Sequence, residues 1–531
     1  MKNYKYILSL ALIFIAGGMI FQSCTKNYED INTDPYNPVE ADLRADFVVI
    51  GEPIKEAQMN FYTFNPVWVM QLQQNLIGDV YSGYMMPPTP FAGNVNNMTY
   101  ALVNGWNGFP WSVAYSSVMN PLAKSAKNAS VDPNYVNFIG WGKICRVEGM
   151  HRVSDIYGPL VYSQFGIPAA DGSFAYDCQG DLYNEFFADL AEGIDILTPY
   201  ANDESLPKVF KNFDLVYGGD YVKWIKFANS LRLRLAIRIS NIDPAKAKTE
   251  AEAAVGNSFG LLTSNEENFM VNGKLSHPLN TINNAWNDVR MGASMESILG
   301  GFQDPREAAY FQTSEIEPGV FKGIRAGIDI KAKSDYQPFS KLVDLDLVQL
   351  MTCSEVAFLK AEGALRGWDM GGTAQEFYEE GIRLSFEQHG ISAGDYSEYI
   401  ANDVLTPMAY TDPVSDINNI DAASAVTIKW NDADDNELKL EKIITQKWIA
   451  MFPDGQEAWS EFRRTGYPKQ FPVMENNSGG TISTDDFIKR INFVDGEYNA
   501  NPVGVQGAVQ CLGGPDNGGT NLWWDVDGGN F

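Results

Sequence analysis

Residues that commonly bind metal ions are scarce in this chain of 531 residues. It has only three histidines, each more than 100 residues from the next: His151, His277 and His389. The spacing of its five cysteines matches no zinc site, and no H-E-x-x-H segment occurs. A glycine-rich phosphate loop with a lysine is also absent from the sequence. We therefore expect no zinc site and no bound cofactor.

Basic residues are also few. Lys and Arg total 39 against 67 Asp and Glu, which gives a formal net charge of −28. Binding to a nucleic-acid backbone needs a basic stripe that releases counterions, and the sequence contains no such stripe. Nucleic acid is therefore excluded as a partner. The apolar content of 45% also excludes an intrinsically disordered chain.

The chain has only one long apolar run. Residues 7–21 are 15 uncharged residues that follow Lys2 and Lys5. The run is shorter than the ~20 residues that cross a bilayer as a helix, but it has the dimensions of a secretory signal. We therefore expect the mature chain to be exported and to have no membrane span.

A cysteine stands where this signal ends. Cys24 follows the small residue Ser23, an arrangement that resembles a lipoprotein signal, in which the cysteine receives acyl chains such as palmitate. We expect a lipoprotein signal peptide over residues 1–23, lipidation at Cys24, and a polar tether over residues 24–40. The alternative is an ordinary signal peptide with a cysteine nearby by chance.

The other four cysteines leave their pairing open. Cys145 and Cys353 lie in apolar helical segments and are expected to be small buried residues. One disulfide is possible in an oxidising compartment, and the sequence does not say which cysteines form it. The remaining two are Cys178 and Cys511.

Apolar residues recur at helical spacing in six segments. In residues 220–240, Trp224, Leu231 and Leu235 fall on one face. The other five segments are 134–156, 181–198, 353–366, 373–389 and 438–452. We predict a mainly α fold in which tetratricopeptide-like helix pairs stack, with long irregular loops and few short strands. With no charged linker between these segments, residues 41–531 are expected to form a single domain.

Motifs of catalysis are weak. Residues 256–260 match the G-x-S-x-G motif of serine hydrolases, but this motif needs a strand before the serine, and residues 245–255 are expected to be helical. Gly256 fits the C-terminal end of that helix instead. A glycosidase needs a pair of carboxylates, but with 67 acidic residues such pairs are bound to occur close together in the sequence, so finding them does not indicate a glycosidase. We expect no enzymatic activity; the alternative is a surface hydrolase with an unrecognised carboxylate pair.

An acidic loop partly resembles a calcium site. Residues 432–436 place oxygen ligands as an EF-hand loop does, but Glu437 replaces its glycine and Ile443 replaces its last glutamate. The EF-hand is therefore excluded. A looser structural Ca²⁺ site stays open, and the alternative is a solvated acidic loop.

Aromatic residues are abundant in two loops rich in glycine, proline and asparagine, at 78–110 and 271–301. Aromatic rings stack on the apolar faces of sugars or on peptide side chains, and Asn and Arg supply directional hydrogen bonds. The candidate ligand-binding residues are Tyr81, Tyr84, Trp106, Asn107, Trp286, Asn287 and Arg290. For each aromatic residue, the alternative is that it pins its loop onto the helices.

Six sequence blocks, taken in order, resemble the SusD/RagB family of outer-membrane lipoproteins. The most specific block is IITQKWIAMFPDGQEAWSEFRRTGYP at 443–468. The others are 28–35, 155–160, 224–240, 304–306 and 355–368. Together they extend over nearly the whole mature chain.

The resemblance implies a fold with about four tetratricopeptide-like helix pairs. It also implies a lipid-anchored outer-membrane protein at the cell surface, which captures oligosaccharides or oligopeptides and passes them unchanged to a SusC-like TonB-dependent transporter. The choice between glycan and peptide stays open. Arg463 and Arg464 lie in the most specific block, where we interpret them as structural residues paired with acids. A purely structural helical-repeat adaptor is the remaining alternative.

Overall fold

The structure, a computed structural model, describes residues 46–206 and 208–531. The expected signal peptide (1–23), the lipidation site Cys24 and the tether (24–40) lie outside these residues. Among the residues described, none of the helices combines the length and the apolar character that a membrane span requires.

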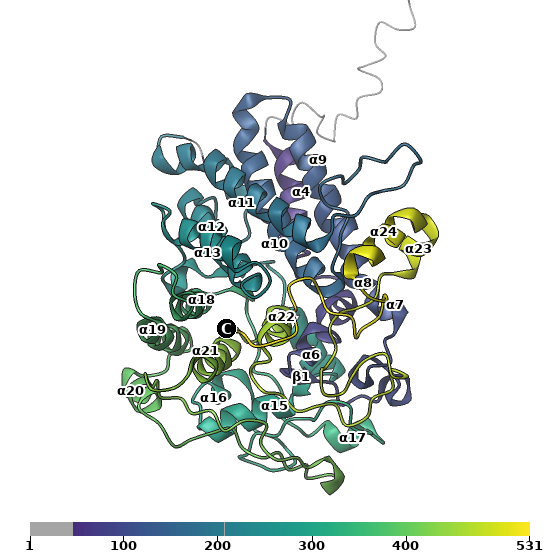
Figure 1. Ribbon diagram of the computed structural model, residues 1–531, viewed down its shortest axis with the longest axis vertical. Coiled ribbons are helices and arrows are strands. Elements are labelled where there is room, and N and C mark those ends of the chain that lie inside the picture. Colours follow the sequence, from purple (N-terminus) through teal and green to yellow (C-terminus); the bar gives the residue numbers. More distant parts are fainter. Residues whose placement is uncertain (1–45, 207) are drawn as a thin grey trace, which may run out of the picture.

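Four helix pairs form the scaffold within the described residues (Figure 1). They are α10 (Val136–Tyr157) with α11 (Gln179–Asn202), α12 (Tyr221–Arg238) with α13 (Pro244–Val255), α18 (Cys353–Leu365) with α19 (Ala374–Gln388), and α21 (Asn436–Met451) with α22 (Gly455–Thr465). Neighbouring pairs pack through α11 on α12, α12 on α18 and α18 on α21. The predicted mainly α fold of stacked tetratricopeptide-like pairs is confirmed.

Local sequence explains where these helices begin. The Asp220 carboxylate accepts hydrogen bonds from the first backbone N–H groups of α12, and Asp435 does the same for α21. Thr373 and Glu376 form a capping box at α19. The apolar face predicted for residues 220–240 is buried, so that each helix is held by packing as well as by its cap.

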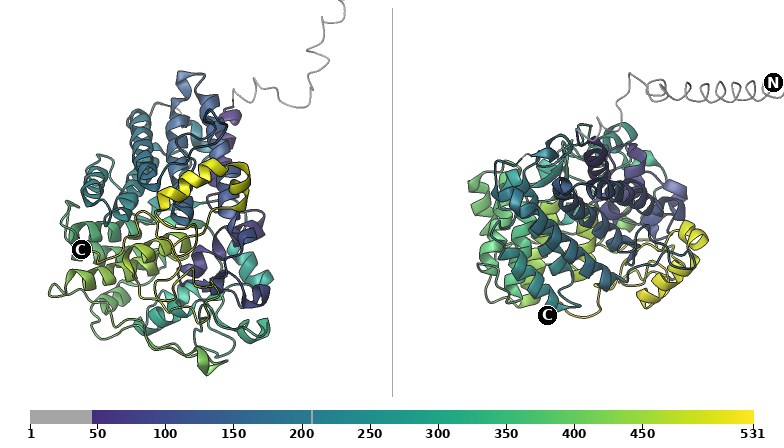
Figure 2. Two further views of the ribbon diagram at one scale, coloured as in Figure 1. Left: turned by 45° about the vertical axis from the view of Figure 1, so that its right-hand side comes forward. Right: turned by 90° about the horizontal axis from the view of Figure 1, so that it is seen from above.

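Shorter helices surround the scaffold. α4 (Val48–Gln58) and α9 (Asn120–Ala129) pack on each other and on α10. The loops carry α5 (Val67–Met70), α6 (Gly78–Tyr81), α7 (Asn104–Asn107), α8 (Phe109–Val113), α14 (Pro278–Asn280), α15 (Ala293–Met295), α16 (Glu307–Tyr310), α17 (Lys333–Tyr336), α20 (Ala393–Ile400), α23 (Asp495–Ala500) and α24 (Pro502–Leu512). In Figure 1, α7, α8, α23 and α24 lie on the side opposite α19 and α20, and Figure 2 (left) brings this side forward.

The described strands are short, as predicted, and they form two antiparallel pairs. β2 (Phe269–Val271) pairs with β4 (Val348–Met351). β1 (Met85–Met86) pairs with β3 (Arg290–Met291), with Met85 opposite Met291. The second pair joins the two aromatic loops, which lie about 200 residues apart in the sequence.

Buried charges hold the helix pairs in register. Arg238 of α12 pairs with Glu457 of α22 (2.5 Å) and with Asp155 of α10 (3.2 Å), and it also pairs with Glu461 of α22. The side chains of all four residues are at most 2% exposed. Because a buried charge without a partner is costly, these ion pairs favour the observed helix register.

The two arginines of the most specific sequence block have different roles. Arg464 pairs with Glu362 (2.6 Å) and Glu461 (2.7 Å), so its predicted pairing with acids is confirmed. Arg463 instead lies over the Trp459 ring at 3.6 Å and donates to the backbone oxygen of Lys489 at 2.7 Å. The prediction of an acidic partner was wrong for Arg463, because its guanidinium stacks on an aromatic ring and binds carbonyl groups.

Glu148 of α10 is a buried carboxyl group without hydrogen bonds. Both of its carboxyl oxygens lack a hydrogen-bond partner within the described part of the chain. Burial raises its pKa, the positive charges of Arg234 and Arg152 oppose this effect, and the negative charges of Asp454 and Glu457 add to it. The resulting pKa is about 8. At neutral pH the folded protein therefore keeps a proton that the unfolded chain would release.

Replacing Glu148 by Gln should change how stability depends on pH. The unfolded glutamate loses its proton near pH 4.5 and the folded one near pH 8, so the wild-type protein loses stability as pH rises between these values. The variant has no such titration. The free energy of unfolding of the variant, relative to that of the wild type, should therefore increase by a few kcal/mol between about pH 5 and about pH 9. Urea unfolding at both pH values measures this gain. The same trend in the control Glu52→Gln, at an exposed position of α4, would contradict the explanation.

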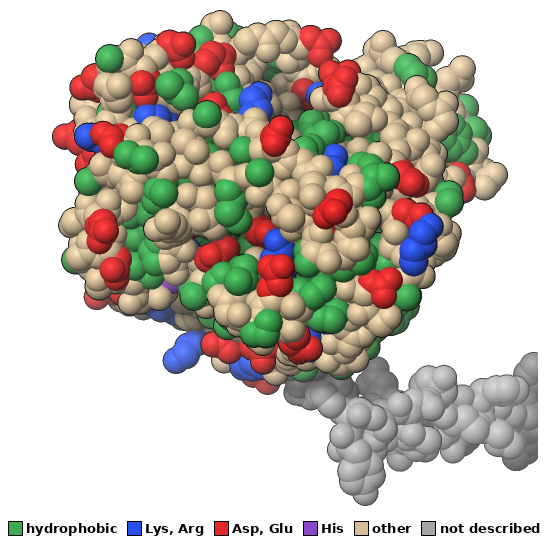
Figure 3. Space-filling view, turned by 90° about the horizontal axis from the view of Figure 1, so that it is seen from below, with side chains coloured by type: hydrophobic (Ala, Val, Ile, Leu, Met, Phe, Trp, Pro, Cys, Tyr) green, Lys and Arg blue, Asp and Glu red, His purple; other side chains and the backbone are tan. Residues whose placement is uncertain are grey.

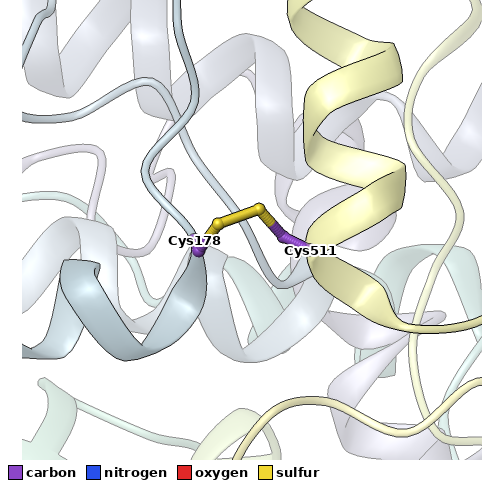
Figure 4. Close-up of a disulfide and its surroundings, with 2 residues drawn as sticks. All are labelled: Cys178 and Cys511. Carbon is purple, nitrogen blue, oxygen red and sulfur yellow. A yellow bond between two sulfur atoms is a disulfide. The ribbon is translucent and has the colours of Figure 1, made fainter.

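One disulfide links the start of α11 to the C-terminal helix α24 (Figure 4). Cys178, just before α11, is bonded to Cys511 in α24, with a Cα–Cα distance of 5.4 Å and a sequence separation of 333 residues. Cys145 and Cys353 are free, and both are buried, as was predicted of their burial. The disulfide therefore fixes the C-terminal helices α23 and α24 to the scaffold.

Acidic side chains are spread over the face seen in Figure 3. Basic side chains on this face, within the described part of the chain, are isolated and form no stripe.

Candidate ligand-binding groove

An open groove of about 500 Å³ lies between loops from three distant parts of the sequence. One wall is the segment 95–104, which leads into α7. The other wall is formed by residues 477–481 together with Asn492, and by residues 516–518. The groove therefore lies on the side of the molecule that carries α7 and α23 (Figure 1).

The polar side chains of the groove are mostly amides and hydroxyls. They belong to Asn104, Asn477, Ser478, Thr481, Asn492, Asp516 and Asn517. The only charged residue of the lining, Asp516, forms an ion pair with Arg490 and accepts a hydrogen bond from the Tyr498 hydroxyl at 2.7 Å. Lys, Arg and His are absent from the described lining. Such a lining offers hydrogen bonds to an uncharged polar ligand.

Trp106 is not one of the lining residues, but it follows the lining residue Asn104 by two positions. It shares α7 with Asn104, whose side-chain amide donates to Asp495 at the start of α23 (3.2 Å). The half-buried Trp106 ring meets Phe91 edge to face, with ring centroids 5.7 Å apart. This contact fixes the orientation of the indole ring.

The backbone on both sides of the groove is strained. Tyr100 in the lining has a φ of 61°, and Ala92, Asn94 and Phe487, which precede or follow lining segments in the sequence, have φ values of 50°, 65° and 59°. Side chains other than glycine rarely adopt this left-handed conformation, especially bulky ones. Strain of this kind is typical of sites where the chain is shaped for a ligand.

The second predicted loop lies next to the first. Thr89 donates a hydrogen bond to Asp288, and Lys333 donates to the Asp288 carboxylate (2.5 Å) and to the Trp286 backbone oxygen (2.7 Å). Trp286 and Asn287 are half-buried. Loop 87–99 therefore connects the surroundings of Trp106 with those of Trp286, which the sequence alone did not show.

Two of the candidate aromatic residues belong to the core. Tyr84 is 0% exposed, packs against Trp448 with ring centroids 4.8 Å apart, and donates its hydroxyl to the Trp448 backbone oxygen. Tyr81 is also buried and packs on Trp459. Neither ring can stack on a ligand here. The expectation that these residues contact a ligand is therefore corrected. Both rings instead hold their loop against the helices, which was the alternative interpretation.

Asn107 and Arg290 are also buried. Asn107 exchanges side-chain hydrogen bonds with Asn97, at 2.7 and 3.3 Å. Arg290 donates to the backbone oxygen of Gln337 (2.7 Å) and to the side chain of Asn287 (3.2 Å), and burial lowers its pKa to about 10. Both expectations of direct ligand contact are corrected, because these groups are used to hold the loops in shape.

The C-terminal wall of the groove was not found from the sequence. Its segments Ser478-Gly479-Gly480-Thr481 and Asp516-Asn517-Gly518 are polar turn sequences that would suit any loop. Nothing local in them indicates that they lie beside residues 95–104. Only the folded scaffold brings these parts of the chain together.

The acidic loop with the possible calcium site uses its carboxylates within the protein. Asp432 accepts the Trp430 indole N–H at 3.0 Å, Asp434 pairs with Lys442 at 2.7 Å, and Asp435 caps α21. Among the residues described, no three His, Cys, Asp or Glu side chains are grouped so that they could hold a metal ion. The Ca²⁺ site stays a prediction.

Comparisons with known proteins agree on one family. The sequence model of the SusD-like family, described as "Susd and RagB outer membrane lipoprotein", matches residues 30–525. Among solved structures, a chitin-binding SusD homologue from Flavobacterium johnsoniae is 48% identical, with a TM-score of 0.88, over 91% of this chain and 100% of its own. A SusD homologue from Bacteroides vulgatus is 36% identical, with a TM-score of 0.86, over 92% of this chain and 100% of its own. A search among curated proteins finds no match.

Proposed function

Because the chain belongs to the SusD-like family of outer-membrane lipoproteins, we propose that it binds an oligosaccharide of the chitin type at the cell surface. In this proposal it is anchored by lipid at Cys24 and passes the glycan to a SusC-like TonB-dependent transporter. The glycan leaves the protein chemically unchanged.

The observation that carries the proposal is the polar groove, whose described lining has no cationic side chain, together with Trp106 in the same helix as the lining residue Asn104. A pyranose ring has an apolar face that stacks on an indole and hydroxyl groups that need hydrogen-bond partners. The amide and hydroxyl groups of the groove supply such partners. Because the described lining lacks cationic side chains, a neutral glycan fits this groove better than a sulfated or uronic one.

The relative from Flavobacterium johnsoniae supports the chitin type. It is chitin-binding, and it matches 91% of this chain. N-acetylglucosamine, the unit of chitin, carries an amide that can both donate and accept a hydrogen bond. The amides of Asn104, Asn477 and Asn517 have the matching groups.

Calorimetric titration of the purified protein with β-1,4-linked N-acetylglucosamine hexamer tests the proposal. We expect saturable binding, and we expect Trp106→Ala to weaken it about tenfold, because a lost stacking contact is worth about 1.4 kcal/mol. The hexamer should be recovered intact after incubation. Cleavage would instead support a hydrolase.

Two controls accompany this titration. Tyr396→Ala removes a half-buried aromatic residue from α20, on the opposite side of the molecule, and should leave the affinity unchanged (Figure 1). Maltohexaose, which lacks the acetamido groups, should bind more weakly than the chitin hexamer. Equal affinity for both sugars would overturn the chitin assignment, and no binding of any glycan would overturn the proposed function.

A further inference from the structure

An exposed tryptophan lies outside the groove. Trp68 in α5 is 49% exposed and is the only tryptophan among the exposed large apolar side chains of the described residues. Its ring meets Phe109 of α8 edge to face, with centroids 5.2 Å apart and planes at 85°. Such a contact covers only part of an indole and holds the rest in a fixed orientation toward solvent.

Helical spacing relates this pair to Trp106. Phe109 follows Trp106 by three residues, and Gly108 between α7 and α8 keeps a helical backbone (φ −83°, ψ −12°). Residues three apart lie on the same face of a helix. One edge-to-face contact joins Phe91 to Trp106 and another joins Phe109 to Trp68, and we call these four residues the aromatic row. Trp106 shares α7 with the lining residue Asn104, whereas Phe109 lies in the following helix α8.

Exposed polar residues lie near both members of the Trp68–Phe109 pair in the sequence. Asn65, three residues before Trp68, and Ser112, one helical turn after Phe109, are both exposed. The next exposed large apolar side chain along the described sequence is Val95, at the groove itself. Protein interfaces bury contiguous apolar patches, whereas a single ring with polar neighbours matches the alternation of apolar faces and hydroxyl groups on a sugar chain.

We propose that Trp68 is a second stacking subsite for the glycan whose first units bind in the groove. This inference rests on the proposed function and adds a preference for chain length. A short oligosaccharide occupies the groove and Trp106 only. A longer one continues along the aromatic row and places a further sugar ring on Trp68.

Titration with β-1,4-linked N-acetylglucosamine trimer and hexamer tests the second subsite. We expect Trp68→Ala to weaken binding of the hexamer about tenfold and to leave binding of the trimer unchanged. Trp106→Ala should weaken binding of both oligomers. Trp68→Phe keeps an aromatic face and should retain most of the affinity for the hexamer.

The outcomes separate this inference from the proposed function. If the wild-type protein binds both oligomers and Trp68→Ala binds them equally well, the second subsite is refuted while the proposed function stands. An equal loss for trimer and hexamer would also refute it, because Trp68 would then belong to the groove. Unchanged glycan binding with weaker co-purification of a transporter would assign Trp68 to a protein interface instead. If the wild type binds neither oligomer, both proposals fail.

The melting temperature of Trp68→Ala should equal that of the wild type. Equal melting temperatures exclude misfolding as the cause of weaker glycan binding.

Discussion

Replacing Arg238 by Ala should lower the free energy of unfolding by about 3–5 kcal/mol. The substitution leaves three buried carboxylates, those of Asp155, Glu457 and Glu461, without their shared cation. Lys447, at 3.0 Å from Glu461, compensates only in part. Chemical denaturation at neutral pH measures the loss.

An exposed arginine provides the matched control. Arg383 of α19 pairs with Glu387, and both side chains are at least 42% exposed. Arg383→Ala should cost less than about 1 kcal/mol, because exposed ion pairs contribute little. Similar losses for both variants would show that the Arg238 ion pairs do not hold the helices together.

The pH dependence of the Arg238 variant provides a further check. Burial raises the pKa of Glu457, but Arg238, Arg234 and Lys447 outweigh it and lower the pKa to about 2. The stabilisation from this group is therefore present above about pH 4.5 and is lost as pH falls toward 2. The difference between the wild type and Arg238→Ala should shrink over the same range.

Tyr84→Ala should also destabilise the protein, by about 3–5 kcal/mol, because it removes a fully buried ring from the core. The ring contacts Trp448 and Phe452, with centroids 4.8 and 5.4 Å away. Thermal and urea unfolding measure this loss.

Tyr84→Phe separates stability from binding. It keeps the ring and removes only the hydroxyl donor to the Trp448 backbone oxygen, so it should cost about 1 kcal/mol. Its affinity for the chitin hexamer should equal that of the wild type. A loss of affinity like that of Trp106→Ala would mean that Tyr84 contacts the ligand, in conflict with its burial.

The helical scaffold could be predicted because its signal is local. The apolar residues of 220–240 recur with the helical period, and burying that face decides the structure of the segment. The loops carry no such signal. Tyr84 and Trp106 occur in similar surroundings of Gly, Pro and Asn, yet one ring is buried and the other is half-buried.

The site could be predicted only in part because its geometry depends on distant contacts. The aromatic content of the loops pointed to Trp106 and Trp286. The pairing of β1 with β3 brings their loops together, but strands of two residues are too short to have a sequence signature. The groove wall at 516–518 and the exposure of Trp68 follow from how the C-terminal and N-terminal segments pack. The different partners of Arg463 and Arg464 likewise depend on which side of α22 each residue faces.

The disulfide between Cys178 and Cys511 has a consequence for proteolysis. The groove wall at 95–104 precedes Cys178, and the wall at 516–518 follows Cys511. A single cut anywhere in the 333-residue span between the cysteines would therefore leave these two walls covalently joined. A nicked molecule would migrate as one species in a gel until it is reduced.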